Sequence, residues 1–215
     1  MNKHTIALFL AVILVAAGCR LGGITGNGHV VTDTRPVGDF SEIEANGGFR
    51  IEWRSGAPSL SITTDSNLLQ YVTVENIDHR LQIHSRANLW PTHHLSVAIS
   101  SPNRLGARLT GAAQLTANEL SGQSFAVEST GAAKVTLDGK VDELITDMTG
   151  ASQLNAESLQ TKKAEISSTG ASKASVAVAD ALKVSITGAG KVVYSGNPPT
   201  VEKHVTGAGS IRHKE

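Results

Sequence analysis

Three aspartates in the second half of the chain, Asp138, Asp142 and Asp147, are the acids whose spacing most invites a catalytic interpretation. Cleavage or elimination on a polysaccharide needs ionisable groups clustered on one face, within hydrogen-bond reach of the reacting atoms. These three acids fall at different phases of the repeat described below, and each also suits a solvated turn. We therefore expect no catalytic residues and no enzyme activity.

Histidines form a second candidate set, because imidazole nitrogens bind metal ions. The residues concerned are His79, His84, His93 and His94. Their spacing matches no standard ligand motif, and no carboxylate pattern completes it. The sequence also lacks a nucleophile elbow, a phosphate-binding loop, a C-x-x-C pair and an H-E-x-x-H helix motif. We expect neither a metal nor a cofactor.

Both tryptophans, Trp53 and Trp90, lie beside predicted turns in the N-terminal part of the chain. A large amphipathic ring can pack in a core, lie at a rim or serve as a platform for a sugar. The sequence favours core or rim positions for both residues.

The single cysteine, Cys19, follows a segment typical of a secretory signal. An apolar run from Thr5 to Ala17 is too short for a comfortable membrane span, and the small residues Ala16-Ala17-Gly18 precede the cysteine. This arrangement resembles a bacterial lipobox, which implies cleavage before Cys19 and acylation of that residue. By the same resemblance, Arg20 favours the outer membrane of a Gram-negative bacterium. An ordinary secretory signal with an incidental cysteine remains the alternative.

A short phrase, Thr-Gly-Ala, occurs six times at nearly even intervals. Its copies begin at Thr110, Thr130, Thr149, Thr169, Thr187 and Thr206, with steps of 20, 19, 20, 18 and 19 residues. A fixed period of this size is the signature of a stacked-repeat fold, in which each repeat buries its apolar face against its neighbours.

The repeats alternate with a period of two, which indicates strands. The fourth residue after each glycine is always apolar, and the second residue after each glycine is always small. We therefore expect both positions to face the interior. The threonine before the glycine and the third residue after it should face water. We call the first outward set the Thr column; the second, the Gln/Lys column, consists of Gln114, Lys134, Gln153, Lys173 and Lys191.

A unit of about nineteen residues fits one coil of a parallel β-helix with a slender interior, and an aromatic content of only 4% agrees with that. The repeated glycine indicates either a corner with positive φ or a close approach of two backbones. A leucine-rich repeat is disfavoured, because its leucine pattern and its asparagine ladder are missing from this sequence. An antiparallel meander remains open as an alternative.

The N-terminal third has the same strand pattern without the repeated phrase. We expect a signal peptide over 1–18, an anchor and tether over 19–29, and one β domain over 30–215. That domain has an irregular section over 30–105 and about six regular coils of 18–20 residues over 106–215.

These features resemble the head GIN domain family of putative auto-transporter adhesins. The resemblance lies in "RPVGDFSEIEANGGFRIEW", in the serial glycine-centred repeats and in the closing "VVYSGNPPTVEKHVTGAGSI". It implies a right-handed, single-stranded β-helix outside the cytoplasm. Relatives often carry Ser-Gly-Ser-Gly-Asp where this chain has Thr-Gly-Ala, so an acidic outward column is replaced here by glutamine and lysine.

Composition bounds the possible partners. Lysine plus arginine equals aspartate plus glutamate at 19 each, and neither sign forms a run, which gives no electrostatic case for nucleic acid. We expect a lipid-anchored, non-enzymatic binding or adhesive module whose two outward columns contact a polymeric glycan or an envelope protein. A polysaccharide-active enzyme and a purely structural envelope protein are the alternatives; ice binding is disfavoured because the column beside the threonines is alanine.

Overall fold

The computed structural model describes residues 22–214, and these residues form strands and one short 3-10 helix, η1 (Leu69–Tyr71). The strands before the repeats are β1 (Ile24–Thr25), β2 (Val30–Thr34), β3 (Glu42–Gly47), β4 (Arg50–Ser55), β5 (Ser59–Asp65), β6 (Val72–Ile77), β7 (Arg80–Ser85), β8 (Leu89–Trp90) and β9 (Ser96–Ser101). The later strands are β10 (Gly106–Gly111), β11 (Gln114–Gly131), β12 (Lys134–Gly150), β13 (Gln153–Gly170), β14 (Lys173–Gly188), β15 (Lys191–Ser195), β16 (Thr200–Gly207) and β17 (Ser210–His213).

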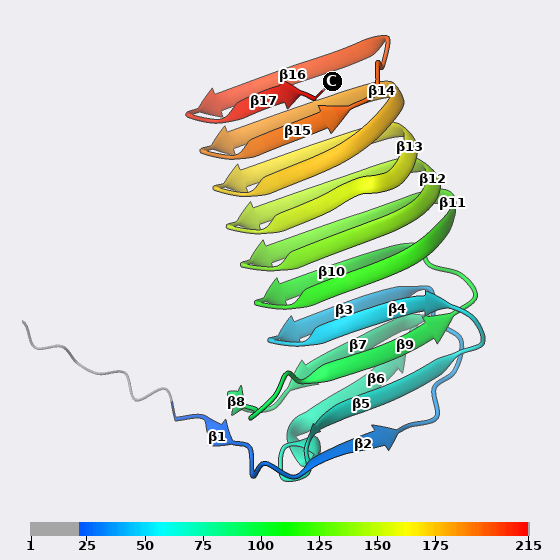
Figure 1. Ribbon diagram of the computed structural model, residues 1–215, viewed down its shortest axis with the longest axis vertical. Helices are drawn as coiled ribbons and strands as arrows, with labels where there is room; N and C mark the ends of the chain where they lie inside the picture. Colours follow the sequence, from blue (N-terminus) through cyan, green and yellow to red (C-terminus); the bar gives the residue numbers. More distant parts are fainter. Residues whose placement is uncertain (1–21, 215) are drawn as a thin grey trace, which may run out of the picture.

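The repeats build a parallel β-solenoid of about five turns, in which each long strand folds back on itself and stacks on the next coil (Figure 1). Every strand pair from β10 to β17 is parallel. Equivalent residues of successive repeats pair directly, as Lys134 does with Gln153 and Gly150 with Gly170. The all-β, β-helical prediction is confirmed, and the antiparallel meander is wrong for this part of the chain.

The predicted inward positions form the core. Leu115, Val135, Leu154, Ala174 and Val192, the fourth residues after each glycine, are all buried. The small second residues, such as Ala133 and Ser152, are buried as well. At the last coil Ile211 is only partly buried and Val205 is 41% exposed, because no further coil covers them.

Polar side chains lie at the C-terminal end of the solenoid. Lys203 pairs with the buried Val184, so it occupies an inward position of the last coil. Its Nζ lies 5.2 Å from the centre of the Tyr194 ring, on which the His213 ring also stacks. An inward-pointing charge on a terminal strand discourages a further strand from joining the sheet edge.

The N-terminal end contains antiparallel strands that the repeat pattern did not indicate. β2 pairs antiparallel with β5, β5 with β9, and β6 with β7, and they lie at the end of the stack away from the repeats (Figure 1). Two coils flank the coil made of β3 and β4: on one side the coil made of β7 and β9, and on the other side the first repeat coil. Coils therefore do not stack in sequence order here.

Arg104 lies at the crossover that this order requires, between β9 and β10. It is 6% exposed, and its guanidinium donates hydrogen bonds to the carbonyl oxygens of Trp53, Asn118 and Glu119. Burial lowers the pKa of Arg104, and the nearby Glu119 carboxylate partly opposes that effect. The arginine thus satisfies backbone acceptors of coils that the chain connects out of order.

Asp65, at the end of β5, is fully buried and holds the N-terminal segment against the domain. Its carboxylate accepts hydrogen bonds from the backbone of Gly28, from the backbone of Thr92 and from the Thr92 hydroxyl. Burial alone would raise the pKa of Asp65, but these hydrogen bonds outweigh it and the pKa lies below its ordinary value.

Candidate binding surface

The Thr column runs without interruption along six stacked strands. Thr110 pairs with Thr130, Thr130 with Thr149, and the register continues through Thr169 and Thr187 to Thr206. All six side chains are exposed, as the alternation predicts. Paired residues on neighbouring parallel strands lie about 4.8 Å apart, so the hydroxyls form an evenly spaced row.

The glycine after each threonine forms a corner. Gly131, Gly150 and Gly170 have φ values of 108°, 98° and 111°, and a β-carbon on each would lie 2.6–2.7 Å from the carbonyl oxygen of the glycine one coil earlier. Both expectations for the glycine are correct, since it has positive φ and its backbone also approaches its neighbour closely. The corner glycines are exposed or partly exposed, and the small residues two positions later, such as Ala133 and Ser152, are buried in the core.

The Gln/Lys column lies on the other side of this corner. Gln114 pairs with Lys134, Lys134 with Gln153, Gln153 with Lys173 and Lys173 with Lys191. The four later side chains are exposed and Gln114 is partly exposed. The exposed alanines of the corner, such as Ala132 and Ala151, separate the two columns.

Both columns extend into the N-terminal section, beyond the copies of the repeated phrase from which they were predicted. Asn46 pairs with Thr110 and His84 pairs with Asn46, so they continue the Thr column. Arg50 pairs with Gln114 and continues the Gln/Lys column. The signal was present, because Arg50 follows Gly47 by three residues, as Lys134 follows Gly131.

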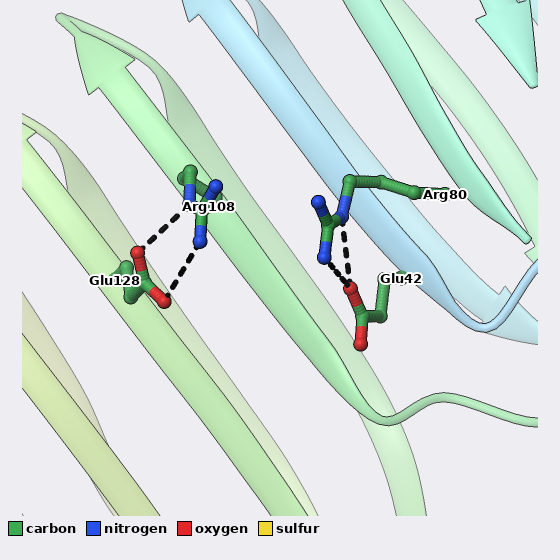
Figure 2. A network of polar contacts seen from close by, with 4 residues as sticks. All are labelled: Glu42, Arg80, Arg108 and Glu128. Carbon is green, nitrogen blue, oxygen red and sulfur yellow. Dashed lines mark hydrogen bonds and ion pairs between the residues drawn. The ribbon is translucent and has the colours of Figure 1, made fainter. Parts of the chain in front are cut away.

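Ion pairs join neighbouring strands on the face that carries the Thr column (Figure 2). Arg108 Nε and Nη2 donate to the two carboxylate oxygens of Glu128 at 2.8 and 3.0 Å, and Arg80 donates to Glu42 at 2.6 and 2.9 Å. The hydrogen bond from Arg108 lowers the pKa of Glu128, and Glu128 in turn raises the pKa of Arg108.

Farther along the same face, Lys183 Nζ lies 2.7 Å from a Glu165 carboxylate oxygen. Gly106 and Ala126, which have little or no side chain, leave a hollow of about 110 Å³ between the two arginine pairs. Arg80, Arg108 and Lys183 of this face are therefore engaged with carboxylates of adjacent coils.

The three candidate catalytic acids do not come together. Asp138 lies at the second corner of its coil and accepts a long hydrogen bond from the Glu119 backbone. Asp142 forms an ion pair with Lys162 at 2.8 Å, and the hydrogen bond from Lys162 lowers the pKa of Asp142. Asp147 is exposed and pairs with Glu128 and Ser167. A lowered pKa keeps a carboxyl ionised, which is the opposite of what a general acid needs.

The histidines and tryptophans occupy separate places. His79 contacts the Asp39 carbonyl oxygen, His84 continues the Thr column, and residues 22–214 contain no group of histidine, cysteine and acid side chains able to hold a metal ion. Trp53 is fully buried and donates to the Ser101 hydroxyl, whereas Trp90 is 56% exposed at the rim.

The proposed acylation site, Cys19, lies outside the described residues, as do the expected signal peptide and the first part of the tether. Over the part of the chain that the structure describes, no helix has the length and apolar character needed to cross a membrane.

Comparison with known proteins gives a family match and several structural relatives. The family model described as "Putative auto-transporter adhesin, head GIN domain" matches residues 39–198. A putative adhesin from Bacteroides fragilis is similar in structure, with a TM-score of 0.73 and 20% sequence identity over 89% of this chain and 100% of that chain. A putative lipid binding protein from Parabacteroides distasonis has a TM-score of 0.55 at 20% identity, over 89% of this chain and 99% of that chain.

A putative adhesin from Parabacteroides merdae has a TM-score of 0.50 at 21% identity, over 90% of this chain and 99% of that chain. At these identities the structural likeness shows the fold. No curated protein matches the chain in sequence.

Proposed function

Because the chain belongs to the family described as putative auto-transporter adhesin, head GIN domain, we propose that it is a non-enzymatic adhesive or binding module of the cell envelope. In this proposal a lipid on Cys19 anchors the protein to the outer membrane of a Gram-negative bacterium, and the solenoid binds a polymeric glycan or an envelope protein. Membership of an adhesin family supports an envelope- or surface-associated protein. The lipid anchor, the choice of membrane and the class of ligand are proposed in addition.

One observation carries the binding role: the same outward side chains recur in register from coil to coil. Thr130 and Lys134 have direct equivalents one coil away in Thr149 and Gln153. A contact too weak to matter alone can be summed along a polymer that touches several coils, because each further contact forms at a high effective concentration. A regular ladder is suited to a repetitive partner.

The enzyme alternative has less support. Catalysis on a polymer needs acid and base within reach of one bond. Asp138, Asp142 and Asp147 occupy separate columns, and Asp142 and Glu128 are held ionised by basic partners. A purely structural role would need neither column to bind a ligand.

The test is a screen of the full chain, purified in detergent, against polysaccharides and envelope proteins, with binding and cleavage measured on the same samples. We expect binding that strengthens with polymer length, little affinity for single sugars and no cleavage. Cleavage that disappears in Asp138→Asn, Asp142→Asn or Asp147→Asn would overturn the binding role in favour of an enzyme. Failure to bind any polymer or envelope protein would favour the structural alternative.

A further inference from the structure

The two outward faces of the solenoid differ in charge, although the chain as a whole is neutral. On the face of the Thr column, Arg80, Arg108 and Lys183 are each paired with a glutamate from an adjacent coil. On the face of the Gln/Lys column, no ion pair within residues 22–214 involves Arg50, Lys134, Lys173 or Lys191. Four cations without an ion pair in the described part of the chain therefore lie in one row on the face of the Gln/Lys column.

Few acids accompany these cations. The next outward column on the same strands consists of Glu52, Thr116, Thr136, Asn155, Ser175, Val193 and Arg212. Its one acid, Glu52, is engaged with Arg54 at 2.8 Å. On the other side lie the small alanines of the corner. The Gln/Lys column is thus an exposed basic row, bordered mostly by small or neutral side chains, with charged neighbours only at Glu52 and Arg212 near its two ends.

The order of residues in this row is informative. From the N-terminal end it reads Arg50, Gln114, Lys134, Gln153, Lys173, Lys191. Cations and amides alternate over the first five coils. With about 4.8 Å between coils, the alternating cations lie about 10 Å apart, which is close to the length of two sugars in an extended polysaccharide.

From this row we infer that the ligand is a linear acidic polysaccharide with one anionic group in each disaccharide. Its acidic sugars would lie opposite Arg50, Lys134 and Lys173, and its neutral sugars opposite Gln114 and Gln153, whose amides can both donate to and accept from hydroxyls. The inference rests on the proposed binding function and names the chemical class of the ligand. A nucleic acid fits less well, because its phosphates recur about every 3.4 Å along a strand, far more densely than these cations.

The experiment compares ligands that differ in charge spacing. Isothermal titration of the full chain in detergent would use oligosaccharides of alternating glucuronic acid and N-acetylglucosamine, from the disaccharide to the decasaccharide. Matched probes are a neutral glucan, a polyuronate with an acid on every sugar, and single-stranded DNA. We expect the alternating oligosaccharide to bind most tightly, with affinity that rises with length and falls with added salt.

Two triple variants separate the row from charge in general. Arg50→Gln, Lys134→Gln and Lys173→Gln together should weaken binding roughly tenfold, because several exposed ion pairs are lost at once. Lys140→Gln, Lys163→Gln and Lys183→Gln together remove the same net charge elsewhere and should leave affinity unchanged. Circular dichroism would show that both variants keep the fold.

Equal losses in the two triple variants would overturn the inference, as would preference for the neutral glucan, the polyuronate or DNA, or no binding to any acidic polysaccharide. Binding to another polymer in those cases would leave the broader proposal of a binding module standing, so the two failures can be told apart.

Discussion

A β-carbon on Gly150 would lie 2.6 Å from the carbonyl oxygen of Gly131 in the preceding coil. The φ of Gly150 is 98°, in a region that residues with a β-carbon rarely adopt. Every regular coil repeats this corner, which sets the Thr column and the Gln/Lys column on either side of it. The corner is therefore a structural requirement of the binding surface.

Replacement of that glycine should be costly. We expect Gly150→Val to lower the free energy of unfolding by at least about 1–3 kcal/mol, because the new side chain adds backbone strain to a steric overlap. Ala151→Val, at the exposed neighbouring position, should lie within about 0.5 kcal/mol of the wild type. Urea denaturation measures both, and equal stability of the two variants would show that the corner tolerates a side chain.

The alternation of inward and outward positions predicts opposite outcomes for two adjacent residues. Leu154 is 3% exposed, so Leu154→Ala should cost about 2–5 kcal/mol through lost burial and a cavity. Gln153 is exposed, so Gln153→Ala should change stability by less than about 0.5 kcal/mol. Similar losses in denaturant titrations of both variants would contradict the assigned faces.

A buried hydroxyl in the core offers a stabilising change. Ser168 Oγ is buried and has no hydrogen-bond partner, whereas Ser172 Oγ donates to the Gly150 carbonyl oxygen at 3.2 Å. Removing an unsatisfied buried polar atom returns its desolvation cost, so Ser168→Ala should raise the free energy of unfolding by about 1 kcal/mol. Ser172→Ala should lower it, and the opposite order would be evidence against this assignment.

The lowered pKa of Asp65 makes a prediction about acid. A carboxyl with a depressed pKa in the folded state contributes stability above its unfolded pKa, about 3.9, and loses it as pH falls through the folded value. Asp65→Asn should therefore have a lower melting temperature than wild type at neutral pH. The difference should shrink below about pH 4. The explanation would be wrong if the difference in melting temperature between Asp65→Asn and wild type stayed constant on acidification. It would also be wrong if Asp147→Asn, a change at an exposed aspartate, produced the same difference.

Anchoring can be tested by acylation. If Cys19 carries the lipid, Cys19→Ser should accumulate as an uncleaved or soluble precursor, because several acyl chains hold a protein at a membrane whereas none remain in the variant. Radiolabelled palmitate should enter the wild type alone, and fractionation should place the wild type with membranes. Equal labelling of both proteins would rule out this site.

Much of the regular part could be predicted because its information is local. A period near nineteen residues with inner alternation places Leu154 inward and Gln153 outward wherever the coil lies, and equivalent residues of successive coils must then stack. The Thr column and the Gln/Lys column followed from that alone. The structural role of the repeated glycine was harder to predict. A positive φ and a close approach of two backbones both require glycine, so the sequence alone does not distinguish them.

The order of the N-terminal coils was decided only by the tertiary structure. β3, β7 and β10 share the same strand pattern, so local periodicity cannot say that β3 lies between the other two. That order depends on long-range contacts, including the hydrogen bonds of Arg104 to backbone oxygens of two coils. The basic row was hidden for a similar reason: the composition is neutral, and only the register of the coils places Arg50 in line with the lysines of the Gln/Lys column.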